Sequence, residues 1–287
     1  MQDFRSPSLR LRRFASELRR AREAAGFTAA KAAKELGWSS TKVTRMEAKE
    51  AKRIKPDDLD GLMDLYGVTD TSKRECMHAL AKDARIRGWW SKYKDVFRNE
   101  TLPDFEAEAS VLRSYDGQVI PGLLQTPEYM RALFRGGRYA THEEVEKRTQ
   151  ARMKRREILT RHQPVHLHSV IDESAFQRPI GGVAVMLHQL KYLLHVAQMP
   201  HIEVQVLPYS KGAHAGLTAP FILLDFSHPL DTPIVCVPTL TDALYLEECE
   251  DVEAYSTTFE EVKNSALSSA ESAEYIASQI KTLERPS

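Results

Sequence analysis

Residues 28–47, TAAKAAKELGWSSTKVTRME, constrain the fold of this chain more than any other stretch. They predict two short helices joined by a tight turn at Gly37. Thr28 is suited to cap the first helix, because its hydroxyl can accept a hydrogen bond from a free amide of the first turn. We expect that helix to end near Leu36. Gly37 readily adopts the left-handed backbone that ends a helix, and Ser39 is suited to cap the second helix.

The second helix of this pair has two chemically different faces. Val43 and Met46 lie three residues apart, so both side chains point to one face and are expected to pack inward. The outward face carries small hydroxyl groups and two cations, at Ser40, Thr41, Lys42 and Arg45. A short helix of this kind, leaving a glycine turn, suits the major groove of DNA. The segment therefore predicts a helix-turn-helix.

The charge of the chain is divided unevenly along the sequence. The 287 residues hold 40 Lys and Arg and 40 Asp and Glu, a balance that by itself argues against nucleic-acid binding. Residues 1–55, however, hold 15 basic and 6 acidic residues, a net charge of +9, which leaves residues 56–287 at −9. A basic segment of this kind is either a solvated surface or an electrostatic footprint for phosphates. Together with the helical pattern, it favours the footprint.

Length and composition limit the remaining possibilities. A chain of 287 residues is long enough for one small and one larger domain with separate cores. No apolar run approaches the roughly 18–20 residues that a membrane span requires, and the polar, arginine-rich N-terminus predicts no secretion signal. The three cysteines, Cys76, Cys236 and Cys249, have no close pairing and no metal-like spacing. We expect a cytoplasmic protein without metal or cofactor, and no membrane partner.

Five helices are expected in residues 1–88, which we assign to an all-α domain. Pro56 is suited to the first position of the fourth helix, and Ser72 with Glu75 forms a capping box for the fifth. The expected helices span 9–25, 28–36, 40–47, 56–66 and 72–87. Residues 89–103, which begin with two tryptophans, are expected to form a connector.

Residues 104–287 have a mixed pattern of helices and strands, beginning with an amphipathic segment at 105–113. Helices are expected at 126–134, 142–161, 183–198, 252–267 and 270–283. Strands are expected at 165–171, 202–208, 221–226, 234–237 and 243–247. The sequence therefore predicts a multidomain protein, with an all-α helix-turn-helix head followed by a mixed α/β (α+β) domain for ligand or partner binding and dimerisation.

The sequence also resembles a known family over most of its length. ELRRAREAAGFT and LGWSSTKVTRME resemble the λ-repressor-like (XRE-type) helix-turn-helix regulators. VIPGLLQTPEYMRAL, DESAFQRPIGG and VQVLPYSKGAHAGLTAPFILLDF resemble the domain that follows this head in actinobacterial antitoxin-like transcriptional regulators. The resemblance implies a sequence-specific DNA-binding regulator that forms a homodimer. It also implies control by a small partner protein, often encoded by a neighbouring gene, and a C-terminal domain whose ligand is not established.

Three positions of the head depart from the family pattern. Ala29 stands where a Gln often reaches the phosphate backbone, and Ala32 stands where Leu usually adds core volume. Lys49 occupies the place of a Gly, which predicts that the recognition helix continues by a turn. That extra turn would carry Lys49, Lys52 and Arg53 towards phosphates.

The resemblance assigns roles to residues around the turn. The positions of Ser40, Thr41 and Arg45 face base edges in the family. Arg45 is the strongest candidate for a base contact, because a guanidinium can donate hydrogen bonds to both O6 and N7 of guanine. Contacts to phosphate are expected from Thr28, Ser39, Lys42, Lys49 and Arg53. For Ser39 a plain helix cap is an equal alternative, and Glu47 is expected to bond within the head.

Three classes of function remain open. The first is a DNA-binding regulator controlled by a partner protein, and the second is a regulator that senses a small molecule in a pocket of the C-terminal domain. The third, an enzyme with a vestigial head, is disfavoured. Asp172 and Glu173 are adjacent and diverge, while His166 and His168 have no third metal ligand at a telling spacing. A second basic run, from Arg148 to Arg161, is either a solvated face or an additional contact to DNA or to an acidic partner.

Overall fold

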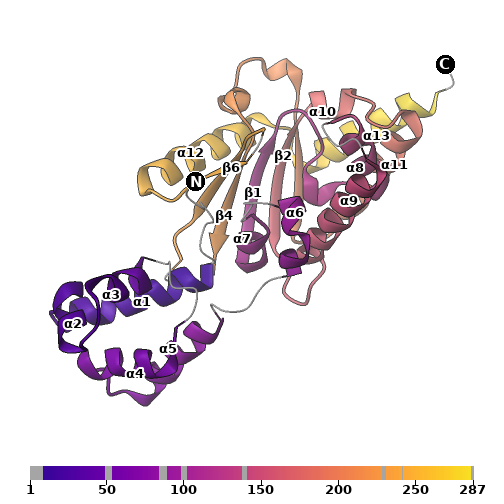
Figure 1. The fold of residues 1–287 in the computed structure, drawn as a ribbon. Coiled ribbons are helices and arrows are strands. Elements are labelled where there is room, and N and C mark those ends of the chain that lie inside the picture. Colours follow the sequence, from indigo (N-terminus) through magenta and orange to yellow (C-terminus); the bar gives the residue numbers. More distant parts are fainter. Residues whose placement is uncertain are drawn as a thin grey trace. The chain divides into compact units, whose positions relative to one another are not determined.

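The computed structural model describes residues 9–48, 54–83, 89–97, 102–137, 141–227, 231–240 and 242–285. The chain forms two compact units, Met1–Lys92 with His228–Asp231, and Tyr93–Ser227 with Thr232–Ser287. The first unit is helical and the second contains a six-stranded mixed sheet with helices (Figure 1). The predicted fold class is therefore confirmed.

The first unit, called the head below, contains five described helices. They are α1 (Leu9–Ala24), α2 (Ala29–Glu35), α3 (Ser40–Glu47), α4 (Pro56–Leu65) and α5 (Thr71–Asp83). Two caps differ from expectation. Ser39 precedes α3, but its side chain makes no capping hydrogen bond. The Ser72–Glu75 capping box is wrong as well, because α5 starts one residue earlier and the Asp70 carboxylate accepts from the Lys73 amide at 3.1 Å. The expected end of this helix at Arg87 lies outside the described residues.

The core of the head is drawn from all five helices. Phe14 and Leu18 of α1 are fully buried, as are Leu59 and Leu62 of α4. Ala32 of α2 is also fully buried. The small side chain at this position therefore lies within the packed centre of the head, where neighbouring helices approach it closely.

The second unit is built on one sheet with the strand order β3-β2-β1-β4-β5-β6. Strands β1, β2 and β3 are mutually parallel, and β4, β5 and β6 continue the sheet in antiparallel pairs. Their bounds are β1 (Ala109–Asp116), β2 (His166–Asp172), β3 (Ile202–Leu207), β4 (Phe221–Phe226), β5 (Ile234–Pro238) and β6 (Ala243–Leu246). The amphipathic segment at 105–113 is thus divided between the end of a helix and the strand at the centre of the sheet.

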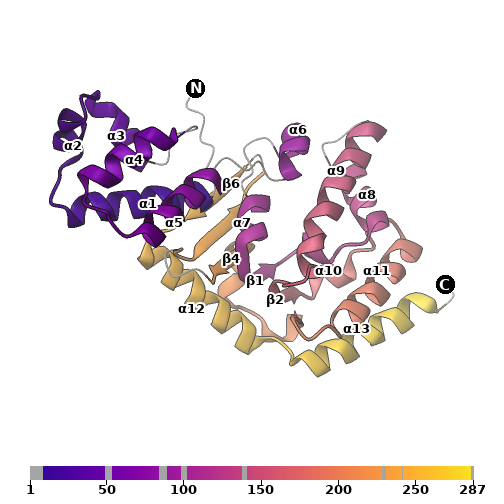
Figure 2. The same cartoon turned by 90° about the horizontal axis from the view of Figure 1, so that it is seen from below.

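Helices cover the sheet of the second unit. The main ones are α7 (Leu102–Glu108), α8 (Pro127–Arg135), α9 (His142–Arg156), α11 (Val183–Val196), α12 (Cys249–Ser265) and α13 (Ser269–Glu284). Its short elements are α6 (Lys94–Phe97), η2 (Gly122–Leu124), η3 (Glu157–Leu159), α10 (Ser174–Gln177), η4 (Tyr209–Lys211) and η5 (Ala215–Thr218). The 3₁₀ turn η1 (Trp89–Tyr93) lies at the boundary between the two units. Figure 2 shows α12 on one side of the strands and α8, α9 and α11 grouped on the other.

The second unit agrees with its sequence pattern at α12 and differs from it at α9. Phe259 and Val262 of α12 are fully buried against Tyr115, Val170 and Phe221 of the strands. Helix α9 ends at Arg156 and continues only as the 3₁₀ turn η3, so it is shorter than the expected span to 161. Within the described residues, no helix has the length and apolar character needed to cross a membrane.

Candidate nucleic-acid interface

The turn between α2 and α3 is built from local hydrogen bonds. The Thr28 hydroxyl accepts from the Lys31 amide at 3.2 Å and caps α2, as expected. Gly37 has a φ of 66°, the left-handed conformation that ends α2. Its neighbour Trp38 donates its amide to the Ala33 carbonyl at 2.8 Å. The Trp38 bond closes the C-terminal motif of α2 at Gly37, where the chain turns into α3.

Helix α3 has one buried face and one exposed face. Val43 and Met46 are buried in the head, as their spacing predicted. Thr41, Thr44 and Arg45 are exposed. These three positions are related by the i, i+3, i+4 spacing of one helical face, and we call them the α3 stripe. Thr44 was not among the expected contacts, although its spacing from Thr41 was sufficient to find it.

Arg45 is the only cation of the α3 stripe. Its side chain is exposed, and among the described residues no hydrogen-bond or ion-pair partner engages it. A guanidinium in this position keeps all five N–H donors for an external acceptor. The side chain of Ser40, the third expected base contact, lies outside the described part of the structure.

Lys42 is held within the head, to one side of the stripe. Its ammonium donates to Asp58 of α4 at 2.7 Å, with side-chain exposures of 35% and 23%. The same nitrogen lies 3.6 Å from the centroid of the Trp38 ring. Asp58 therefore offsets the charge that Lys42 was expected to offer to phosphate.

A buried ion pair fixes α3 against α1. Arg22 donates to both carboxylate oxygens of Glu47, at 2.8 and 2.9 Å, and also to the Phe27 carbonyl at 2.6 Å. Hydrogen bonding to Glu47 is the main reason that the pKa of Arg22 is raised. The expectation that Glu47 bonds within the head is confirmed. The pair acts on the site indirectly, because it sets the position of α3.

The structure describes only some of the remaining residues that were expected to contact phosphate. Thr28 and Ser39 are exposed, and the Ser39 hydroxyl lies 3.2 Å from that of Thr41. Lys49 and Arg53 lie outside the described residues. Lys31 and Lys34 on α2 are exposed cations that the expected list omitted. Their spacing of three residues, which places both side chains on one face of the helix, was the signal for them.

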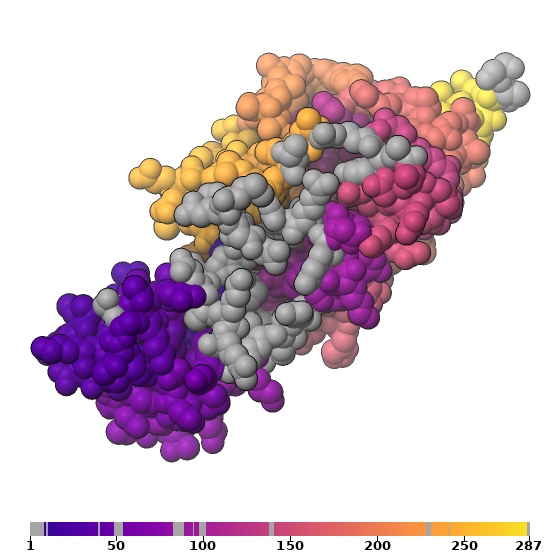
Figure 3. All heavy atoms as spheres, in the orientation of Figure 1, coloured from indigo at the N-terminus to yellow at the C-terminus, as the bar shows by residue number. Residues whose placement is uncertain are grey.

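Arginines of the second basic run form ion pairs and hydrogen bonds within the second unit. Arg155 forms a bidentate pair with Glu106 at 2.7 and 2.8 Å, with side-chain exposures of 11% and 1%. Arg152 and Arg156 donate to the side chain and the carbonyl of Gln125, at 2.6 and 2.9 Å. These residues bind α9 to α7 and to the 120–126 segment. The side chains of α9 also form part of the outer surface of the unit (Figure 3).

Comparison with known proteins gives one family match in each of the two units. A helix-turn-helix domain matches residues 13–75, which include α2, Gly37 and the α3 stripe. A domain of unknown function (DUF5753) matches residues 99–278. No curated protein and no solved structure matches the chain. The helix-turn-helix domain makes the protein a DNA-binding regulator of transcription. Because the second match covers more than half of its length, the chain belongs to the DUF5753 family, with a helix-turn-helix domain preceding the family's domain.

Proposed function

We propose that this DNA-binding protein is an antitoxin-like, sequence-specific regulator that binds double-stranded DNA as a homodimer. A small partner protein, encoded by a neighbouring gene, controls it through the second unit. The observation that carries the DNA part of this proposal is the α3 stripe, where Thr41, Thr44 and Arg45 are exposed on a helix fixed by a buried ion pair. Short hydroxyls beside a free guanidinium match the donors that contact base edges in the major groove.

Selection of duplexes from a random pool tests sequence-specific binding and identifies the operator sequence in the same experiment. The full chain is expected to enrich a motif, and a gel shift on DNA upstream of its own gene should then show the same preference. The two half-sites of a homodimer are expected about 34–36 Å apart, one helical turn. Failure to enrich any duplex would instead favour an enzyme with a vestigial head.

Control by a partner is tested by co-purification with the small protein of the neighbouring gene. The complex is expected to bind the selected duplex with a different affinity from the regulator alone. Coupling must be reciprocal, so the duplex must also change the affinity for the partner by the same factor. Unchanged DNA affinity in a stable complex would contradict partner control.

One observation favours a second candidate function, a regulator that senses a small molecule. The second unit contains a pocket of about 450 Å³ lined by residues of α8 and by the turn that precedes α11. This volume lies in the range of small-molecule sites. A thermal-shift screen with metabolites, repeated with the selected duplex present, separates this candidate from partner control.

A further inference from the structure

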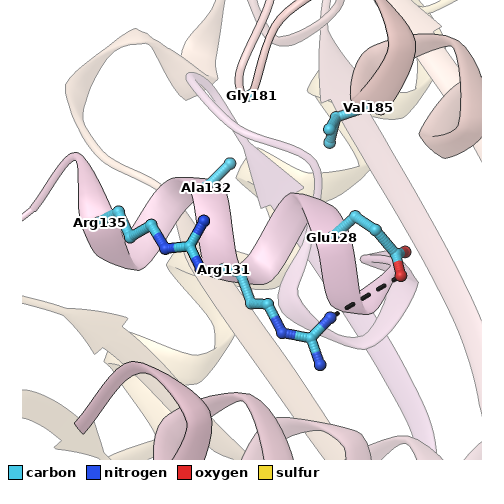
Figure 4. A pocket seen from close by; sticks show the side chains of 6 residues that line it. All are labelled: Glu128, Arg131, Ala132, Arg135, Gly181 and Val185. Atoms are coloured by element: carbon cyan, nitrogen blue, oxygen red, sulfur yellow. Dashed lines mark ion pairs between the residues drawn. The ribbon is translucent and has the colours of Figure 1, made fainter. Parts of the chain in front are cut away.

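The pocket in the second unit has a definite charge and shape. It lies between the exposed face of α8 and the start of α11 (Figure 4). Its lining residues are Glu128, Arg131, Ala132, Arg135, Gly181 and Val185. None of them takes part in the DNA interface, and none belongs to the α9 arginine contacts described above.

Two of the three charged residues in the pocket already bind other groups. Arg131 donates to both carboxylate oxygens of Glu146 on α9, at 2.8 and 3.2 Å, which fixes its guanidinium in place. Glu128 lies 3.8 Å from Arg131 and 3.4 Å from the His188 ring. The Glu128 carboxylate is therefore partly compensated by groups beside it.

Arg135 is the charged residue of the pocket lining that has no ion-pair partner among the described residues. It lies one helical turn beyond Arg131 on α8 and is exposed. In the described part of the chain, no carboxylate lies within ion-pair distance of its guanidinium. Its charge acts at longer range on Glu146, whose pKa is lowered mainly by the hydrogen bond from Arg131 and further by Arg135. Glu128 and Glu146 balance the charges of the two arginines over the whole pocket, so Arg135 forms a local positive site at the C-terminal end of α8.

The shape of the pocket depends on the turn at Gly181. This residue has a φ of 77°, and a Cβ there would lie 2.8 Å from the Cβ of Ala132 and 2.9 Å from that of Val185. Only glycine allows this close approach. Ala132 and Val185 supply the apolar part of the pocket lining. A ligand that fits both features carries an anionic group on a short apolar body.

We propose that this pocket binds a small organic anion, a carboxylate or phosphate group on a short apolar body. Arg135 is the direct ion-pair partner, and the fixed guanidinium of Arg131 orients the ligand through its outer edge. Any effect of this anion on DNA binding rests on the second candidate function, the sensing of a small molecule. Binding of the anion itself does not depend on that function and is measured without DNA.

Isothermal titration calorimetry on the full chain tests the site, with inorganic phosphate and succinate as separate probes. We expect at least one probe to bind, with succinate favoured if the apolar part of the lining contributes. Arg135→Gln is expected to weaken binding at least about tenfold, which corresponds to the loss of one charge-assisted contact. Val185→Phe, which fills the pocket without changing charge, is expected to abolish binding. Both positions are at least partly exposed, and thermal unfolding of each variant confirms its folding.

Arg285→Gln is the matched control, because it removes the same charge from an exposed position beyond α13. It is expected to bind as the unchanged protein does. The proposal is overturned if neither probe binds, if Arg135→Gln binds normally, or if Arg285→Gln weakens binding equally. If the probe binds as expected but the selected duplex binds with unchanged affinity, the anion site stands and the sensing function fails.

Discussion

Glu47 is a residue of the head whose substitution is expected to lower the unfolding free energy strongly. Glu47→Gln removes the carboxylate that accepts two hydrogen bonds from the buried Arg22 guanidinium, and leaves only the half-exposed Glu23 carboxylate at 3.5 Å. Removing one partner of a buried pair costs about 3–5 kcal/mol of unfolding free energy. Urea unfolding of the full chain, followed by tryptophan fluorescence, measures it.

Arg19→Gln serves as the control for this prediction. Arg19 pairs with Glu23 at 2.8 Å, but both side chains are more than half exposed. Exposed pairs add little to the unfolding free energy, because water screens the two charges. Equal losses for the two variants would show that the Arg22–Glu47 pair does not hold α3 in place.

The Tyr66 hydroxyl contrasts with the Arg22–Glu47 pair, because it is a buried polar group that is not hydrogen-bonded within the described part of the head. Its ring is buried, its hydroxyl has no hydrogen-bond partner among the described residues, and burial raises its pKa to about 12. Tyr66→Phe removes an unsatisfied buried group, so the unfolding free energy is expected to rise by about 1 kcal/mol. The same urea titration measures this change. A comparable loss of unfolding free energy would mean that the hydroxyl has a partner in solution.

At the scale of the element, the α3 stripe makes a prediction about specificity. Arg45→Ala is expected to cost roughly 1–3 kcal/mol of affinity for the selected duplex and to relax preference at one base position. Lys31→Ala, on an exposed position of α2, should instead weaken all duplexes equally and reduce the salt dependence. Titrations of the two variants with duplex DNA at several fixed salt concentrations measure both effects. Unchanged affinity for Arg45→Ala would remove it from the base contacts.

The contact between α3 and α4 decides whether Lys42 reaches DNA. Asp58→Asn removes the carboxylate that binds the Lys42 ammonium at 2.7 Å. If Lys42 can then contact phosphate, non-specific affinity rises and the slope of log K against log salt steepens by about one. The Asp58→Asn, Lys42→Ala double variant should lose this gain. A slope that is the same in all three proteins would place Lys42 in a purely structural role.

The elements differ in how far the sequence predicted them. The cap at Thr28 and the turn at Gly37 appear where expected, because each depends on residues adjacent in the chain. Strand β1 was missed, since Arg113 and Ser114 interrupt its apolar pattern. Arg113 pairs with Asp225 of β4 at 3.0 Å, and Ser114 bonds Ser169 of β2 at 3.0 Å. Polar residues at the centre of a sheet are recognisable only once their neighbouring strands are known.

At the scale of the whole molecule, the two units have separate cores and are expected to unfold in separate transitions. Burial raises the pKa of Asp116, at the end of β1, to about 7, while the hydrogen bond to Ser114 and the charge of Arg152 act in the opposite direction. The unfolded carboxyl releases its proton near pH 3.9. Between about pH 4 and 7 the folded unit therefore binds more protons, and its stability falls as pH rises.

Asp116→Asn is expected to remove this pH dependence, which amounts to about 4 kcal/mol for a pKa difference of about three units. Calorimetry on the full chain measures this change as a weaker pH dependence of the unfolding transition of the second unit. The other transition, assigned to the head by its response to Tyr66→Phe, should not change. A second-unit transition with the same pH dependence in both proteins would place the titrating group elsewhere.

The sequence by itself determined the class of the head, the order of most helices and strands, and the inward face of α3. These depend on the period of apolar side chains and on caps formed by neighbouring residues. Only the tertiary structure decided which cations remain free. Arg22 and Glu47 lie 25 residues apart, and Arg155 and Glu106 lie 49 apart. A charged side chain takes the partner that packing brings near it, so Arg45 remains exposed while Lys42 is bound to Asp58.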